Sequence, residues 1–265
     1  MKASINGIDI AYDDHGIGIP VLFLHAFPLH KSMWTGQINA LLGEQCYRLV
    51  ALDWPGFGAS PLVGGVLTMN ILADNVAGLM DVLGMEQAVL CGLSMGGYVA
   101  FAFLRKYPQR VQGLILADTR PGADTDEAKA NRERVALLAL SEGTRAIADL
   151  QVPKLLSDYT RRHHPDVEQT VRRMIDVATP QGIAAVSRGM ALRTDSTDLL
   201  SSISCPTLVI VGEEDVLTPP AVAHEYAAGI AGSQFATIPD AGHLSNLEQP
   251  EAFLAIVRNF LLASF

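Results

Sequence analysis

The chain has 265 residues, 49% of them hydrophobic and 18% charged, which is enough for one large α/β domain with a full core. Its 28 acidic residues outnumber 19 basic ones, and the net charge of −9 argues against nucleic acid or an anionic membrane as a partner. No apolar stretch approaches the about 20 residues of a membrane span, and the N-terminal residues lack the apolar segment of a signal peptide.

Strands and helices alternate in the first half of the chain. Residues 5–12 predict two short strands around a turn at Asn6-Gly7. Continuous apolar runs predict buried strands at 20–25, 47–53, 88–93 and 113–118. Helical periodicity predicts helices at 32–42, 68–83 and 94–107. This order predicts an α/β fold with a mostly parallel sheet and helices on both faces.

The pattern changes after residue 119. Residues 120–200 contain no convincing strand, and helices are predicted at 125–140, 143–150, 165–178 and 180–192. Strands at 207–212 and 234–238, with helices at 220–228 and 250–262, then complete the sheet. We therefore predict a core domain made of residues 1–119 and 201–265, interrupted by a helical insertion at 120–200.

The segment Gly92-Leu93-Ser94-Met95-Gly96 joins a predicted buried strand to a predicted helix. Glycines on both sides of the serine allow a turn sharp enough to lift its hydroxyl out of the sheet. The first N–H groups of the helix then point toward whatever the serine attacks. A serine that merely caps the helix is the alternative reading. The strand before, the helix after and two later signals favour Ser94 as a nucleophile.

A serine hydroxyl needs a base to remove its proton and a third group to orient the base. His243 is the preferred base because it lies on a loop after the last predicted strand; the weaker alternatives are His15, His163, His164 and His224. Asp215 follows the strand at 207–212 and is the preferred acid. Asp118, at the end of the preceding strand, is the first alternative, ahead of Glu213 and Glu214.

The oxyanion formed by serine attack needs two hydrogen-bond donors. The backbone N–H of Met95 is one, since it directly follows the nucleophile at the helix N-terminus. We assign the other to the N–H of Phe27, in the turn His25-Ala26-Phe27-Pro28, because Pro28 has no N–H. His25 itself is expected to brace this turn rather than to act in catalysis.

Four segments together resemble the α/β-hydrolase family: His25-Ala26-Phe27-Pro28, Asp53-Trp54-Pro55-Gly56-Phe57-Gly58-Ala59-Ser60, Gly92-Leu93-Ser94-Met95-Gly96-Gly97, and the late Asp215 and His243. The resemblance implies the α/β-hydrolase fold, with an eight-stranded, mostly parallel sheet and a helical cap at 120–200. Ala26 departs from the family, which usually has glycine there, but its N–H remains.

A finer similarity is to the β-ketoadipate enol-lactonase-like and small carboxylesterase branch. It is carried by Phe27-Pro28-Leu29-His30-Lys31-Ser32-Met33-Trp34, Val152-Pro153-Lys154-Leu155-Leu156, Gly182-Ile183-Ala184-Ala185, Arg188-Gly189-Met190-Ala191 and Gly242-His243-Leu244-Ser245-Asn246-Leu247-Glu248-Gln249-Pro250. An enol-lactonase must hold a substrate carboxylate, so a cationic side chain should face its pocket. The candidates are Arg132 and Arg188, followed by Arg134, Lys154, Arg161 and Arg193. Trp34 is a further pocket candidate, although its helical spacing also fits core packing.

The expected function is that of a cytoplasmic serine hydrolase that cleaves a small ester or lactone through an acyl-enzyme. Perhydrolysis of the non-haem haloperoxidase type and C–C bond hydrolysis by the same residues stay open, as does a non-catalytic binding protein. Ser94 argues against the dehalogenases and epoxide hydrolases of this fold, which use an aspartate nucleophile. No metal or cofactor is expected, because the three cysteines lack zinc spacing and no phosphate-binding loop is present. The sequence does not indicate an oligomeric state.

Overall fold

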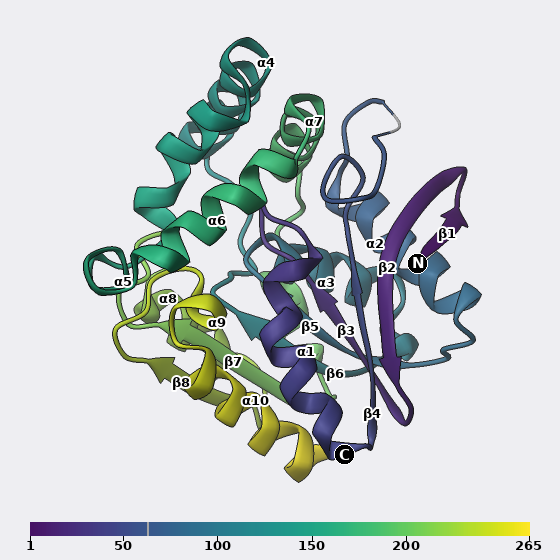
Figure 1. Ribbon diagram of the computed structural model, residues 1–265. Coiled ribbons are helices and arrows are strands. Elements are labelled where there is room, and N and C mark those ends of the chain that lie inside the picture. The colour runs from purple at the N-terminus through teal and green to yellow at the C-terminus, as the bar shows by residue number, and fades with distance from the viewer. Residues whose placement is uncertain (63) are drawn as a thin grey trace.

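The computed structural model describes residues 1–62 and 64–265 and contains one eight-stranded sheet (Figure 1). The strands are β1 (Lys2–Ile5), β2 (Ile8–Gly16), β3 (Ile19–Leu24), β4 (Tyr47–Leu52), β5 (Ala88–Leu93), β6 (Val111–Ala117), β7 (Thr207–Gly212) and β8 (Gln234–Ile238). Their order across the sheet is β1-β2-β4-β3-β5-β6-β7-β8. Strand β2 is antiparallel to both of its neighbours, β1 and β4, and all other neighbouring pairs are parallel, which confirms both the predicted hairpin and the mostly parallel sheet.

Helices cover both faces of the sheet (Figure 1). They are α1 (Thr35–Leu41), α2 (Met69–Val82), α3 (Met95–Lys106), α8 (Pro220–Ala228), α9 (Ser245–Glu248) and α10 (Pro250–Ser264). Helix α1 packs beside α10 and α2 beside α3, so each face carries its own layer. The helix predicted at 32–42 begins as a 3₁₀ turn over Lys31–Trp34. In the described residues, no helix combines the length and apolar character needed to cross a membrane.

The strands in the middle of the sheet read as unbroken apolar runs because both of their faces are covered. Every residue of β5 and of β7 is buried, and Phe23 and Leu24 of β3 are fully inaccessible. Burial on two faces favours continuous apolar sequence over the alternation of a half-exposed strand. These runs make β3, β5, β6 and β7 the rigid base from which the loops described below emerge.

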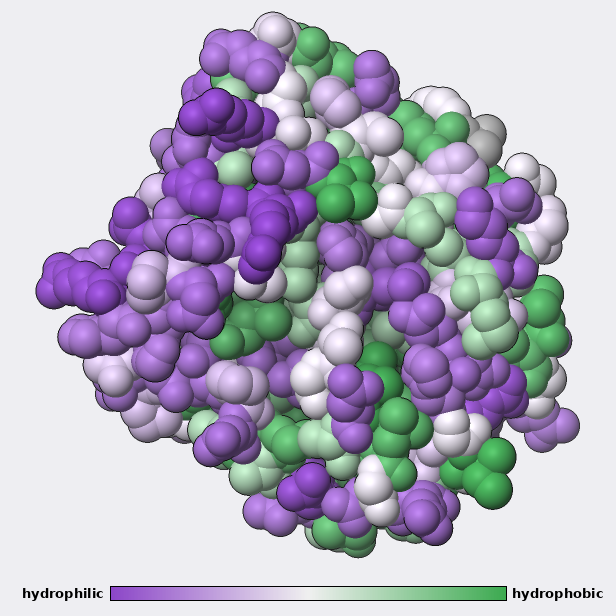
Figure 2. All heavy atoms as spheres, viewed as in Figure 1, coloured by the Kyte–Doolittle hydropathy of each residue, from purple (hydrophilic) through white to green (hydrophobic). Residues whose placement is uncertain are grey.

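Four helices lie between β6 and β7 in the chain and above the carboxyl ends of the strands, at the top and left of Figure 1. They are α4 (Asp126–Leu155), α5 (Asp158–His163), α6 (Pro165–Val177) and α7 (Pro180–Ala191), and together we refer to them as the cap. Figure 2 shows hydrophilic side chains gathered over this part of the surface. The exact limits of the two domains stay a prediction.

Two details of the cap differ from the sequence expectation. Helix α4 breaks at Gly143, whose φ of 80° is not helical, but the second half runs to Leu155 instead of ending at 150. It passes through Pro153, near its C-terminal end, where few hydrogen bonds remain to be lost. Helix α5 was not predicted, although Ser157 caps it by accepting the N–H of Thr160 at 3.0 Å, an ordinary start signal.

Candidate active site

The strand register brings several loops to one edge of the sheet. Leu24 of β3 pairs with Gly92 of β5, and Leu93 of β5 pairs with Ala117 of β6. The strands β6, β7 and β8 are also parallel neighbours. Because parallel strands end at the same edge, the segments that follow β3, β5, β6, β7 and β8 meet there, as in other open α/β sheets.

Ser94 lies on the tight turn between β5 and α3. Its backbone has φ 55° and ψ −113°, a conformation that side-chain-bearing residues rarely adopt. A Cβ on Gly92 would come within 2.5 Å of the Gly96 backbone, and one on Gly96 within 2.0 Å of the Leu24 carbonyl oxygen. The glycines are therefore required by close backbone contact, and the turn holds Ser94 in its strained conformation.

A continuous hydrogen-bonded chain joins three of the predicted residues. The Nε2 of His243 lies 2.7 Å from the Oγ of Ser94, and its Nδ1 lies 2.8 Å from the Oδ2 of Asp215. All three side chains are buried. Asp215 is fixed in turn by the N–H groups of Leu217 and Thr218, at 2.8 and 3.0 Å from Oδ1, and by the Thr218 hydroxyl. A carboxylate held in this way can orient the imidazole and stabilise its protonated form.

Asp118, the alternative acid, has different partners. Its Oδ1 accepts the N–H of Gly212 at 2.8 Å, and its Oδ2 accepts the hydroxyl of Ser245 at 2.5 Å. It therefore links the loop after β7 to the loop that carries His243, without a direct hydrogen bond to the imidazole. The structure brings Asp215, not Asp118, to the Nδ1 of His243.

Comparison with known proteins identifies the family of the fold. The family model described as alpha/beta hydrolase fold matches residues 19–250. The chain belongs to the α/β-hydrolase family. A thermophilic esterase from Thermogutta terrifontis has 47% identity and a TM-score of 0.96, with 100% of this chain and 98% of that chain covered. The enol-lactonase from Burkholderia xenovorans LB400 has 30% identity and a TM-score of 0.90, with 99% and 100% covered.

A third relative of this α/β-hydrolase has a different name. The putative non-heme bromoperoxidase BpoC from Mycobacterium tuberculosis is 30% identical over 259 residues, which span 92% of this chain and 94% of the relative. The fold and the similarity to enol-lactonases and esterases are thus confirmed. The substrate is left open, because relatives of similar identity have different names.

The charges around His243 set the protonation states of this chain of residues. Burial by itself would raise the pKa of Asp215, but the charge of His243 and the hydrogen bonds lower it to about 2. Burial also disfavours the imidazolium of His243, yet the carboxylate of Asp215 outweighs it and raises the pKa of the imidazole. Burial, and then the charge of Asp215, raise the pKa of Asp118 well above its ordinary value. The pKa values of the two aspartates are thus shifted in opposite directions, down for Asp215 and up for Asp118.

The raised pKa of His243 leads to a prediction for the pH dependence of activity. An imidazole that serves as the predicted base can accept the proton of Ser94 only while it is neutral. We therefore expect kcat/KM to increase with pH through a midpoint above 6.5, the ordinary pKa of histidine. The same shift stabilises the folded protein below the unfolded pKa, and this contribution is lost as pH rises through the folded pKa. A pH–rate profile with an uncharged ester tests the prediction, and a midpoint below 6.5 would contradict it.

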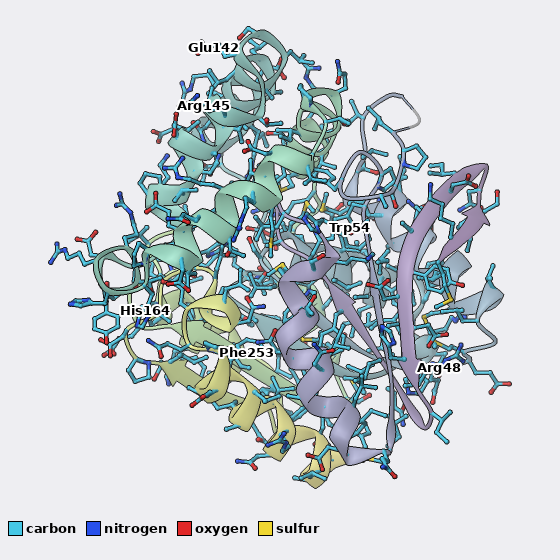
Figure 3. The ribbon with its side chains drawn as sticks, viewed as in Figure 1. Arg48, Trp54, Glu142, Arg145, His164 and Phe253 are labelled. Atoms are coloured by element: carbon cyan, nitrogen blue, oxygen red, sulfur yellow. The ribbon has the colours of Figure 1, made fainter. Side chains whose placement is uncertain are left out.

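His25 has a structural role in the turn after β3. Its ring stands between the Ala26 carbonyl oxygen, 2.9 Å from Nδ1, and the Trp54 N–H, 3.1 Å from Nε2. A neutral ring that donates from Nδ1 and accepts at Nε2 satisfies both partners. Burial accordingly lowers its pKa to about 3. These contacts connect the turn to Trp54, which Figure 3 shows in the interior below the cap.

The two predicted oxyanion donors lie on neighbouring segments. Met95 is the first residue of α3, directly after Ser94, and Phe27 follows β3, the strand beside β5. In residues 1–62 and 64–265, neither backbone N–H donates to another protein group. Both are therefore available to an oxygen bound next to Ser94. The Phe27 side chain also lines the cavity above the serine.

Ser94 and His243 open into a cavity between the sheet edge and the cap, with an empty volume of about 780 Å³ that includes space open to solvent. Its cationic lining residues are Arg120, Arg132 and Lys154, and its anionic lining residue is Asp124. The carboxylate of Asp124 is buried and pairs with Arg132 at 3.0 Å and Arg120 at 3.4 Å. Sequence reasoning missed Asp124 and Arg120, because no local pattern marks them.

A buried arginine completes the charge cluster around Asp124. Arg193 pairs with Asp124 at 2.6 Å, and its guanidinium lies 4.2 Å from the centre of the Tyr98 ring, which lines the same cavity. Burial alone would raise the pKa of Asp124, but the charges of Arg132 and Arg193 outweigh it and lower the pKa. Three arginines around one carboxylate leave the cavity wall with a net positive charge.

Two predicted pocket residues are corrected by the structure. Trp34 is fully buried and packs against Phe23 and Phe253, at ring distances of 5.3 and 6.0 Å, so it belongs to the core. Arg188 forms a bidentate ion pair with Glu133, with N–O distances of 2.6 and 2.9 Å, on the exposed side of the cap. Of the pocket candidates Trp34, Arg132 and Arg188, only Arg132 lines the cavity.

The other four cationic candidates also fall into two groups, one at the cavity and one on the outer surface of the cap. Lys154 lines the cavity, and Arg193 reaches it through Asp124. Arg161 pairs with Glu168 at 3.3 Å on the cap surface, and Arg134 contacts Asn131 there. Outer parts of the cap point away from the sheet, as Glu142, Arg145 and His164 show in Figure 3.

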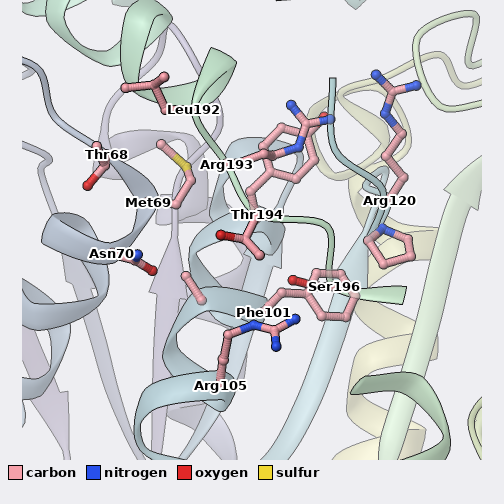
Figure 4. A pocket seen from close by; sticks show the side chains of 13 residues that line it. Thr68, Met69, Asn70, Phe101, Arg105, Arg120, Leu192, Arg193, Thr194 and Ser196 are labelled. Carbon is pink, nitrogen blue, oxygen red and sulfur yellow. The ribbon is translucent and has the colours of Figure 1, made fainter. Parts of the chain in front are cut away.

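Figure 4 shows another cavity, with an empty volume of about 410 Å³ that includes space open to solvent. Arg105, Arg120 and Arg193 line it together with the start of α2, and it shares Tyr98 and Arg120 with the first cavity. Ser94 and His243 do not line it. Across the described residues, no three His, Cys, Asp or Glu side chains are grouped to hold a metal ion.

Proposed function

We propose that this α/β-hydrolase cleaves a small carboxylic ester or lactone through an acyl-enzyme. The observation that carries the proposal is the unbroken chain from the Ser94 hydroxyl through His243 to the Asp215 carboxylate, at 2.7 and 2.8 Å, inside a cavity. A serine hydroxyl paired with an oriented imidazole is suited to acyl transfer. The similarity to esterases and enol-lactonases supports the same reaction class.

The proposed mechanism has two halves. The Oγ of Ser94 attacks the substrate carbonyl while the Nε2 of His243 takes the hydroxyl proton, and the N–H groups of Phe27 and Met95 stabilise the oxyanion. The imidazolium then gives its proton to the departing alkoxide or enolate oxygen, which leaves an acyl-enzyme. His243 next removes a proton from water, and the resulting attack on the ester carbonyl releases the acid and restores the serine. Asp215 keeps Nδ1 protonated throughout.

We propose further that the substrate carries a carboxylate. Arg120, Arg132 and Lys154 line the cavity, and Asp124 neutralises only part of their charge. Arginine binds a carboxylate through two parallel hydrogen bonds, which gives orientation as well as affinity. The enol-lactonase relative and the Thermogutta esterase, which is described as malate-bound, support a substrate of this kind.

Replacement of Arg132 tests this preference. We expect Arg132→Ala to lower kcat/KM for a carboxylated enol-lactone by about ten- to a hundredfold, the worth of one charged hydrogen bond. It should change kcat/KM for an uncharged short-chain aryl ester by only about twofold, since that substrate has no charge to bind. Arg188→Ala is the matched control, because that arginine pairs with Glu133 outside the cavity. Equal losses for both substrates would remove the carboxylate from the proposal.

The relative named as a bromoperoxidase supports a second candidate, perhydrolysis. In that reaction hydrogen peroxide takes the place of water, attacks the acyl-enzyme and leaves as a peracid, while Ser94 regains its proton. Peracid formation can be measured with and without peroxide, using Ser94→Ala as the background. If wild-type enzyme produces peracid faster than it hydrolyses either ester, perhydrolysis becomes the preferred function. If it acts on none of these substrates, hydrolysis of an ester or lactone is the wrong function.

A further inference from the structure

Glu248 is a buried carboxylate that the proposed mechanism does not use. It lies in α9, five residues after His243, and is 4% exposed. Its Oε1 accepts the N–H groups of Gly242 and Leu244, at 2.9 and 3.2 Å, which are the residues on either side of His243. Its Oε2 accepts the N–H of Ser157, between α4 and α5 of the cap, at 2.7 Å. One carboxylate thus holds the histidine loop and the cap together.

The cap makes return contacts with the same loop. The backbone N–H groups of His243 and Leu244 both donate to the carbonyl oxygen of Leu155, the last residue of α4, at 3.1 Å. The Ser157 hydroxyl donates to the carbonyl oxygen of Asp240 at 3.1 Å. The histidine loop is therefore hydrogen-bonded to the end of α4 on one side and to Glu248 on the other.

Gly242 makes this close approach possible. A Cβ at this position would lie 2.7 Å from the nitrogen of Ser157 and 3.0 Å from the carbonyl carbon of Leu156, both backbone atoms. No side chain fits between the loop and the cap at this point. The junction therefore has little freedom, and movement of the α4–α5 connection would be transmitted directly to the backbone of His243.

We propose that Glu248 is a positioning residue for His243, and that the α4–α5 connection of the cap is part of the support of the catalytic base. The proposal rests on the hydrolase function proposed above. The cap then has two roles, since it forms the wall of the cavity through Arg132 and also holds the base through Leu155 and Ser157. Substrate contacts that shift the end of α4 will alter the alignment of the imidazole with Ser94.

Glu248 also contributes charge near the imidazole. Three carboxyl groups act on His243: Asp215 after β7, Asp118 after β6 and Glu248 on α9. Asp215 is in direct contact, whereas Glu248 acts through the loop and through its charge. A Glu248 that only stabilises the fold would leave kcat of the folded enzyme unchanged, whereas a positioning residue changes kcat at similar KM. The two roles can therefore be separated by kinetics, and titration of His243 reports the effect of the charge.

Glu248→Gln tests the proposal with little change in volume. The amide NH₂ cannot accept a hydrogen bond, so it must face either the Ser157 N–H or those of Gly242 and Leu244 as donor against donor. We expect kcat for p-nitrophenyl acetate to fall about tenfold or more, with KM within about twofold, because the base is misaligned. The pKa of His243, followed by NMR titration of its ring, should fall by about half a unit or more through loss of a nearby negative charge.

Glu251→Gln is the matched control, since it makes the same change on the exposed surface of α10, and it should leave kcat and the pKa of His243 unchanged. If Glu248→Gln keeps kcat and the pKa within error of wild type, the positioning role is wrong. If that variant does not fold, Gly242→Ala pushes the same junction apart and leaves the charge of Glu248 in place, although its Cβ would lie 3.2 Å from the Oε1 of Glu248. It should lower kcat at similar KM, and an unchanged kcat would overturn the proposal.

The NMR titration needs no turnover and can be made on Ser94→Ala as well. It therefore reports on Glu248 even if the wild-type enzyme hydrolyses neither ester nor lactone. Failure of the proposed function would appear as absent turnover with a shifted pKa in Glu248→Gln. Failure of the present inference would appear as normal turnover with neither kcat nor the pKa changed in that variant.

Discussion

Ser94→Ala should lower kcat for ester hydrolysis by about six orders of magnitude, the loss found when a nucleophilic serine is removed. The chain His243–Asp215 would remain, but no hydroxyl would stand 2.7 Å from Nε2 to receive the acyl group. Single-turnover measurement with an activated aryl ester is sensitive enough to detect the residual rate. A rate within a hundredfold of wild type would mean that Ser94 is not the nucleophile.

Ser94→Gly separates the cost of the turn from the chemistry of the hydroxyl. Both variants lose the bond to His243, but only glycine adopts φ 55° and ψ −113° without strain. The backbone strain at a residue other than glycine is about 1–3 kcal/mol. Glycine avoids this strain but destabilises the folded state by about 0.5–1 kcal/mol, because its unfolded chain has more conformational freedom. We expect Ser94→Gly to be more stable than Ser94→Ala by about 1 kcal/mol in denaturant unfolding, the difference of these terms. Equal midpoints would show that the elbow is not strained.

The elements that could be predicted from the sequence are those whose structure is determined by residues close together in the chain. The β5 strand and the turn at Ser94 are marked by an apolar run and two glycines within ten residues, and the structure explains both glycines by backbone contact. Asp215 and His243 could be found because each follows a predicted strand, and parallel strands deliver their loops to one edge. Position in the chain order was enough to bring them together.

Contacts between distant segments could not be predicted in this way. The bond from Ser157 to Glu248 joins residues 91 positions apart, and it depends on how the cap docks on the core. Helical periodicity placed Trp34 on the apolar face of its helix. It did not show whether this side chain contacts the cavity or Phe253 of α10. The difference between Arg132 and Arg188 likewise depends on the packing of α4 against α7, which places one on the cavity and pairs the other with Glu133.

Asp215→Asn should lower kcat by about four orders of magnitude, whereas Asp118→Asn should keep it within about tenfold. An amide at 215 can donate to Nδ1 of His243, which places the ring proton on Nε2, where it can no longer accept the proton of Ser94. An amide at 118 can still accept from the Gly212 N–H and donate to the Ser245 hydroxyl, so it keeps the link between the two loops. Asp118 makes no direct hydrogen bond to His243, so the substitution leaves the bond between Asp215 and the imidazole in place.

The pH dependence of folding stability also distinguishes Asp215 from Asp118. Asp215 has a folded pKa of about 2, below that of an unfolded aspartate, so its carboxylate stabilises the fold above the unfolded pKa. That contribution disappears as pH falls through the folded pKa. The stability lost in Asp215→Asn should therefore be largest near neutral pH and shrink toward pH 2. Asp118 has a raised pKa, so its carboxylate destabilises the fold above the unfolded pKa, and Asp118→Asn should show the opposite trend. If Asp118→Asn instead loses the activity and Asp215→Asn retains it, the carboxylate that assists His243 follows β6 and not β7.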